Sequence, residues 1–105
     1  MYTRRLLMNI KPDSAPELAR VTEDEIIPLL RKQKGFRDAV TSIAAGRSQA
    51  ASDSYWETKE DADEYHRAGH QESLKSLVNV VVGLPMVETF EVSNSTFHEI
   101  VAKAA

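Results

Sequence analysis

The chain has 105 residues, no cysteine and a formal net charge of −3, with 42% hydrophobic and 28% charged residues. These values are typical of one globular domain with an ordinary surface. The acidic balance and the lack of basic clusters around the aromatic residues argue against a nucleic-acid partner. The absence of cysteine excludes disulfides, thiolate metal ligands and a cysteine nucleophile, and favours a cytoplasmic location. The apolar run 6–8 is too short for a signal peptide or a membrane span, so no membrane association is expected.

The first part of the chain predicts a strand followed by a helix. Residues 2–11 alternate in polarity as a strand requires. One face of this strand carries Leu6, Met8 and Ile10, and the other carries Arg5, Leu7 and Asn9. A capping box at Ser14–Glu17 predicts the start of a helix that runs toward Gly35. Pro28 predicts a kink or restart in this helix, and a second capping signal leaves a break near residues 20–23 as the alternative.

The rest of the chain predicts a hairpin, a second helix and a last strand. Residues 37–57 form two strands with the turn at Gly46 and Arg47. Alanine and serine fill the middle of this hairpin, which indicates either close packing against another surface or space for a ligand. A cap at Thr58 then begins one long helix. Its buried stripe is expected to comprise Ala62, Tyr65, Gly69, Ser73, Leu77 and Val80. Pro85 ends this segment, and residues 86–92 alternate as the last strand.

The element order is strand, helix, strand, strand, helix, strand. It predicts a single α+β domain over residues 1–105, of the ferredoxin-like βαββαβ kind with an antiparallel sheet. Residues 93–105 are expected to form a C-terminal arm, with a short helix over 95–103. The helices cover only one face of such a sheet, and Leu7 lies on the other. Because a domain of this size buries only about two-thirds of its unfolded surface, we expect a second copy to cover that face. The result would be a homodimeric α/β barrel.

Two stretches of the sequence carry a family resemblance. The run from Tyr55 to His66 has an aromatic strand end followed by Trp, a Thr cap, Glu and Ala, and the run from Ile27 to Phe36 has an internal Pro and closes in Gly-Phe. Both are similar to segments of the antibiotic biosynthesis monooxygenase-like family, part of the dimeric α/β-barrel superfamily. The resemblance covers about residues 2–92. It implies a pocket between sheet and helices, and cofactor-independent oxidation of aromatic, polyketide or quinol-type small molecules.

The family also includes haem-degrading enzymes, and their pattern is incomplete here. Asn9 stands near the position of their first-strand Asn. Tyr65 occupies the place of their helical Trp, and Lys75 falls where they carry a His. The resemblance therefore argues against haem, and we expect no cofactor. Other members carry a His nine residues after the strand-end Trp, whereas here that position is Tyr65 and His66 follows it.

Four side chains around the second helix are candidates for a site. Trp56 is expected either to anchor the core or to form a pocket wall. Tyr65 points toward the sheet, and its hydroxyl needs a partner, which could be Asn9, a serine or a ligand. His66 and His70 lie four residues apart on one side of the helix. His66 lies about 30° and His70 about 70° from the centre of the apolar stripe, which favours His66 as a general base. The spacing lacks the glutamate of the zinc-protease motif, so no metal site is expected.

These residues combine into one functional hypothesis. In a cofactor-free oxygenase, His66 would take a proton from the substrate. Asn9, Tyr65 and Arg5 would donate hydrogen bonds to its oxygens. The expected substrate-binding residues are Trp56, Arg5, Leu7 and His70. Two alternatives remain open: a non-catalytic module that binds a small molecule or is purely structural, and an isomerase of the same superfamily.

Overall fold

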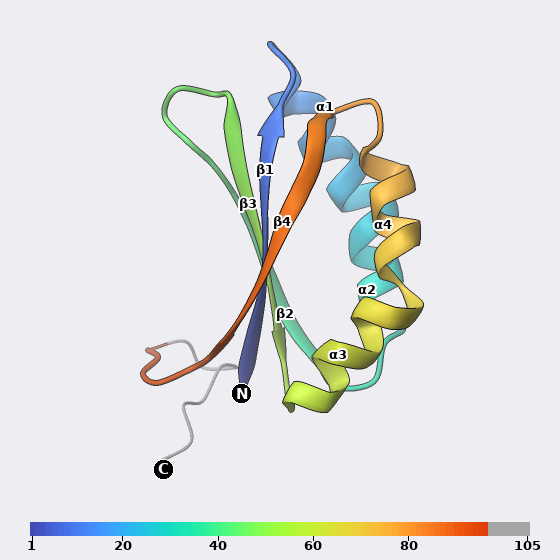
Figure 1. Ribbon diagram of the computed structural model, residues 1–105, viewed down its shortest axis with the longest axis vertical. Coiled ribbons are helices and arrows are strands. Elements are labelled where there is room, and N and C mark those ends of the chain that lie inside the picture. The colour runs from blue at the N-terminus through green and yellow to red at the C-terminus, as the bar shows by residue number, and fades with distance from the viewer. Residues whose placement is uncertain (97–105) are drawn as a thin grey trace.

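The computed structural model describes residues 1–96 as a four-stranded antiparallel sheet with helices on one side (Figure 1). Its elements are β1 (Tyr2–Ile10), α1 (Ala15–Val21), the π-helical segment η1 (Thr22–Ile26), α2 (Ile27–Arg31), β2 (Phe36–Ile43), β3 (Gln49–Trp56), α3 (Lys59–Ala68), α4 (His70–Leu77) and β4 (Val81–Glu91). The strand order is β2-β3-β1-β4, and every neighbouring pair is antiparallel. The ferredoxin-like βαββαβ prediction is confirmed. The helix expected over residues 95–103 lies almost wholly outside the described residues.

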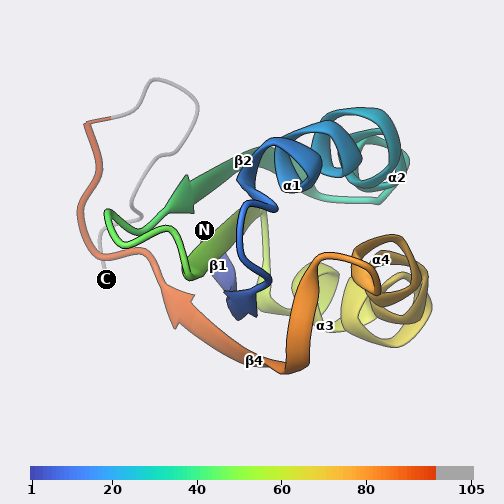
Figure 2. The same ribbon diagram turned by 90° about the horizontal axis from the view of Figure 1, so that it is seen from above.

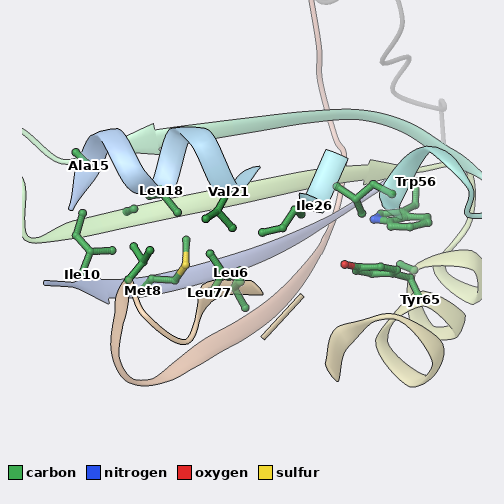
Figure 3. Packing of buried hydrophobic residues seen from close by; sticks show 14 residues of the cluster. Leu6, Met8, Ile10, Ala15, Leu18, Val21, Ile26, Trp56, Tyr65 and Leu77 are labelled. Atoms are coloured by element: carbon green, nitrogen blue, oxygen red, sulfur yellow. The ribbon is translucent and has the colours of Figure 1, made fainter. Parts of the chain in front are cut away.

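The central strand β1 separates the two faces of the sheet. Its even-numbered side chains point to the helices and are buried, as Leu6, Met8 and Ile10 show with exposures of 3–5%. Its odd-numbered neighbour Leu7 points the other way and is 37% exposed. The buried cluster between sheet and helices also includes Leu18, Trp56 and Leu77 (Figure 3). The period-2 alternation of the sequence is therefore the feature that places the core.

Two helical segments cover the same face of the sheet (Figure 2). One consists of α1, η1 and α2, and the other of α3 and α4. The buried stripe expected for the second segment is confirmed, since Ala62, Tyr65, Gly69, Ser73, Leu77 and Val80 are all buried. Within residues 1–96, no helix combines the length and the apolar character that a membrane crossing needs.

The start of the first helical segment differs from the prediction. Helix α1 begins after Ser14, but the capping box is wrong, because the Ser14 hydroxyl donates to the carbonyl oxygen of Lys11 at 2.6 Å and caps no helical amide. The α-helix ends at Val21, within the break considered as the alternative near residues 20–23. The chain continues as the wider helix η1, and α2 starts at Ile27, directly before Pro28, as the predicted restart requires. A wider turn accommodates the proline ring, which would collide with the carbonyl of Asp24 in a regular α-helix.

The long second helix is interrupted, which the sequence pattern did not predict. Thr58 caps α3 as expected, because its hydroxyl accepts a hydrogen bond from the amide of Asp61 at 3.1 Å. At Gly69 the helix is interrupted for one residue, with φ −117° and ψ −16°, and α4 starts at His70. A Cβ atom on Gly69 would lie 2.4 Å from the ring of Tyr65. The absence of a side chain at Gly69 therefore leaves the space that the ring of Tyr65 occupies.

The last strand begins at Val81, so the prediction of a start at Met86 is wrong. Leu7 pairs with Met86 and Asn9 pairs with Val82, so three residues of β4 lie opposite the single residue Met8 of β1. This bulge contains Pro85. Because β4 is an edge strand and is bulged at this point, the missing amide of the proline breaks no essential ladder hydrogen bond. The valines before it then follow their β-branched preference for strand geometry.

The second face of the sheet lacks a covering helix in the part of the chain that is described (Figure 2). Large apolar side chains are exposed there, including Met86 at 60% and Leu84 at 92%. The expectation of an uncovered face is confirmed. That a second copy of the chain covers it remains a prediction.

Candidate functional site

A small cavity lies between β1, β3 and the helices. Its polar lining residues are Arg4, Ser52, Ser54, Tyr65 and Ser73, and its apolar ones are Leu6, Met8, Ile26, Leu30 and Leu77. The volume of about 20 Å³ is room for about one water molecule. Each of the three serines comes from a strand or helix position that faces the core. The site is therefore a polar patch built into an otherwise apolar interior.

A stack of flat groups borders this cavity, and two of its members, Tyr65 and Arg4, line it. The ring of Trp56 lies parallel to that of Tyr65, with 5.1 Å between centroids and 25° between planes (Figure 3). Phe36 meets the other side of Trp56 edge-on, at 5.6 Å between centroids. The guanidinium of Arg4 lies over the far face of this stack, 5.1 Å from the centroid of Tyr65. The stack holds Tyr65 and Arg4 in fixed planes at the edge of the cavity.

Hydrogen bonds satisfy the polar atoms of the two large rings. The indole nitrogen of Trp56 donates to the Ser54 hydroxyl at 2.9 Å, and Ser54 in turn donates to the carbonyl oxygen of Arg4 at 3.3 Å. The Tyr65 hydroxyl shares a short hydrogen bond with that of Ser73. Of the three partners considered for Tyr65, the structure therefore selects a serine.

Arg4 is the most unusual residue of the site. It is charged yet only 5% exposed. Its Nη2 atom lies 2.6 Å from Nδ1 of His70 and 3.2 Å from Nδ1 of His66. A guanidinium can only donate, so in both contacts the imidazole Nδ1 atom is the acceptor. The two rings stack at 4.6 Å between centroids.

Burial dominates the electrostatics around Arg4. It lowers the pKa of the guanidinium, and the opposing influence comes from Tyr65 rather than from any carboxylate. Burial also lowers the pKa of His70, and the positive charge of Arg4 and the proximity of His66 lower it further. Both effects keep His70 in its neutral form at neutral pH.

The structure divides the predicted site residues between the two faces of the sheet. Trp56, Tyr65, His66 and His70 come together on the helical side. Arg5, Leu7 and Asn9 lie on the uncovered side, because odd-numbered positions of β1 point away from the helices.

On the uncovered face, these three residues make contacts of their own. Arg5 forms two hydrogen bonds to Asp53, at 2.8 and 3.1 Å, which raise the pKa of the guanidinium, and it lies over the ring of Phe90. Asn9 accepts a long hydrogen bond of 3.4 Å from Gln49. Leu7 lines a broad hollow of about 530 Å³ together with Met86 and Leu84.

The prediction that His66 lies nearer the core than His70 is wrong. Helical geometry placed His66 nearer the core, but His66 is exposed and His70 is partly buried and closer to Arg4. The closer contact of His70 with the buried Arg4 accompanies its deeper position. In residues 1–96, no group of three or more metal-ligating side chains has the geometry to hold a metal ion.

Sequence reasoning missed Arg4, Ser54 and Ser73. For two of them, the sequence pattern indicates an inward-facing position. Arg4 has the same parity as Leu6 and Met8 on β1, and Ser73 lies on the stripe of Tyr65. A charged or hydroxyl side chain in such an inward position indicates a buried polar site.

Comparison with known proteins supports the fold. No protein-family model matches the sequence, and no curated protein sequence is similar to it. Several solved structures share the fold. A protein of Bordetella bronchiseptica, provisionally assigned as an antibiotic biosynthesis monooxygenase, matches with a TM-score of 0.74 and 15% identity, over 87% of this chain and 95% of the other. The resemblance to this family is thereby confirmed at the level of the fold.

Other solved structures with the same fold carry different names. A monooxygenase from the ActVA-Orf6 gene of Streptomyces coelicolor, in complex with the ligand nanaomycin D, matches with a TM-score of 0.71 and 15% identity, over 91% of this chain and 90% of the other. A protein of Bacillus halodurans from the ethyl tert-butyl ether D family matches with a TM-score of 0.63 and 17% identity, over 88% and 99%. The fold alone therefore does not determine the reaction.

Proposed function

We propose that this protein oxidises a small aromatic or quinol-type molecule without a cofactor, at the cavity bounded by Tyr65, Arg4 and the two histidines. The observation that carries the proposal is a pair of imidazoles held at the edge of the cavity, beside Tyr65, by one buried guanidinium. The nanaomycin D complex of the S. coelicolor monooxygenase shows that a protein of this fold takes a small-molecule ligand.

The reaction makes limited demands on the protein. A substrate with an acidic CH₂ group next to a phenol loses a proton to a base, and the carbanion reacts with dioxygen to form a peroxide. Loss of water from the peroxide leaves a carbonyl, so that CH₂ and O₂ become C=O and H₂O. The protein supplies the base and the donors that stabilise the charged oxygen.

The residues at the cavity match these demands. In the arrangement without ligand, Arg4 occupies Nδ1 of both histidines, so neither ring has a free basic nitrogen. A substrate oxygen that draws Arg4 toward itself would release Nδ1 of His70 and His66 to accept the proton. Tyr65 would donate to the charged oxygen, and Trp56 would form the wall behind it.

The predicted site residues outside the cavity concern the proposed homodimer. Arg5, Leu7 and Asn9 lie on the uncovered face, where we propose that a second copy of the chain packs to complete a homodimeric barrel. The exposure of Leu84, Met86 and Leu7 supports it, because contiguous apolar surface of this kind typically marks an interaction site.

Oxygen consumption tests the enzymatic proposal. The protein is incubated in air with an anthrone- or quinol-type compound, without added metal or flavin, and oxygen uptake and carbonyl formation are followed. We expect turnover above the uncatalysed rate, lowered by at least about tenfold in a His66→Ala/His70→Ala double variant and unchanged in Arg31→Met, a change on the surface of α2. No turnover across a panel of such compounds, or equal turnover in the double variant, would contradict the proposal.

One observation favours a non-catalytic binding protein as the second candidate. The cavity of about 20 Å³ is too small for an aromatic ring unless the helices move away from the sheet. Saturable binding of the same compounds without oxygen uptake would support this alternative.

A further inference from the structure

Within the described part of the chain, no carboxylate forms an ion pair with Arg4. Arg4 takes part in none of the six ion pairs found among residues 1–96. Its neighbour Arg5 shows the usual arrangement on the other face, with two hydrogen bonds to a carboxylate. A buried cation without an anion is strongly unfavourable, because it has lost its hydration without gaining an opposite charge.

One nitrogen of Arg4 is also without a hydrogen-bond partner. Nη2 uses its two hydrogens on His66 and His70, whereas Nε is buried and makes no hydrogen bond. Buried donors of folded proteins are paired almost without exception, and an unpaired one calls for a missing partner. Arg4 lines the cavity, so a group bound there can accept from it.

The surroundings of Arg4 define what that group is. The Ser52 hydroxyl and the Tyr65–Ser73 pair line the same cavity. Because Tyr65 and Ser73 share one hydrogen bond, one hydrogen of that pair and the hydrogen of Ser52 can turn toward an anion. Because Arg4 is the one cationic side chain among the described residues that line the cavity, a ligand with a single negative charge would neutralise it. Beyond the hydroxyls the lining is apolar, at Ile26 and Leu30, and can pack against a ring.

We propose that Arg4 is the anion-binding residue of a site for an organic monoanion, a carboxylate or phenolate oxygen group carried on an apolar ring. The proposal names the ligand class of the cavity on which the proposed function rests, but it requires binding alone and no turnover. The present volume admits about one oxygen atom. Binding of the ring therefore moves the helical segment that carries Ile26 and Leu30 outward from the sheet.

Benzoate and its neutral isostere benzamide test the proposal. Binding is measured by titration calorimetry and by the fluorescence of Trp56, the single tryptophan of the chain, which stacks on Tyr65. We expect the wild-type protein to bind benzoate at least about tenfold more tightly than benzamide, since a charged hydrogen-bonded pair is lost in the neutral ligand. Equal affinities, or no binding of benzoate, would refute it.

Substitutions then locate the anion. Arg4→Met should weaken benzoate binding at least about tenfold and remove the preference over benzamide, while the matched control Arg31→Met, which removes an exposed charge, should bind as wild type. Circular dichroism verifies folding, and Arg4→Lys serves if Arg4→Met does not fold. The lysine keeps the charge without the planar fork and should bind benzoate with reduced affinity. Wild-type affinity in either Arg4 variant would overturn the assignment, and failed turnover with intact benzoate binding would count against the proposed function alone.

Discussion

Nη2 of Arg4 lies 2.6 Å from Nδ1 of His70, and this contact determines the protonation state of the histidine. Because the guanidinium can only donate, Nδ1 must be unprotonated. Protonation of His70 would set two positive charges against each other in a partly buried place. The bond therefore links the folded state to the neutral imidazole.

The stability of the protein should fall below pH 6.5 because of His70. Burial first, and then Arg4 of β1 and His66 of α3, lower the folded-state pKa below the ordinary value of 6.5. The unfolded chain thus binds more protons in this range. The contribution of His70 to the free energy of unfolding is therefore fully present above pH 6.5, decreases as the pH falls from 6.5 toward the folded-state pKa, and levels off below it. A single proton limits this slope to about 1.4 kcal/mol per pH unit. Urea denaturation between pH 5 and 8 should show a shallower dependence for His70→Gln, and an unchanged one for the exposed control Gln71→Asn.

Removal of either hydroxyl in the Tyr65–Ser73 pair should destabilise the fold. Both side chains are at most 4% exposed, so Ser73→Ala or Tyr65→Phe leaves one buried hydroxyl without a partner, at a cost of about 1–3 kcal/mol. The double variant should lose less than the sum of the two single losses, because it leaves no orphaned group. Urea denaturation measures all three, with Ser76→Ala on the same helix as the control. Strict additivity would show that the two hydroxyls do not act on each other.

An alanine at Gly69 should be poorly tolerated. Its Cβ would lie 2.4 Å from the ring of Tyr65, and that ring is held in place by Trp56 and Ser73. We expect a loss of about 1–3 kcal/mol in the free energy of unfolding, as for other overpacked sites. Gly46 provides the matched control, since no atom lies within 4 Å of a Cβ placed there. A Gly69→Ala variant as stable as Gly46→Ala would mean that the ring of Tyr65 moves freely.

A charge on the uncovered face should separate the proposed homodimer. Light scattering on the wild-type protein should give twice the 11.7 kDa of one chain, and Leu7→Lys should give the mass of the monomer, because it buries an unpaired charge in the interface. Val78→Lys is the control, since this valine is 66% exposed but lies at the end of α4 on the helical side. A monomeric wild-type protein at high concentration would contradict the proposal.

The fold was predictable because its signals are local and repeat along the chain. The alternation of Leu6 and Met8 with Leu7 identifies the inner face of β1, and the stripe through Ala62, Tyr65 and Ser73 identifies the inner face of α3 and α4. The features that were missed depend on neighbours distant in sequence. The start of β4 depends on a bulge against β1, and the interruption at Gly69 depends on where the Tyr65 ring lies.

The candidate site was predictable in part. Tyr65, Trp56 and the histidines follow from the helical stripe and the strand end, and they lie together. Arg4 could not be recognised as their partner, since its contacts with His66 and His70 span more than sixty positions of sequence. Charged side chains are expected at the surface unless such contacts are known. The ranking of the two histidines failed because it used only their angles on the helix, whereas their contacts with Arg4 on β1 distinguish them.

The bulge in β4 also restricts how copies of this chain can meet. An edge strand normally offers a row of free backbone groups to which a foreign strand can add, and such addition leads to fibrous aggregates. Here Pro85 removes one donor from that row, and the extra residues around Gly83 disturb its regular spacing. These features disfavour the addition of a further strand at the β4 edge. The protein can therefore expose the apolar face of its sheet without polymerising through this edge strand.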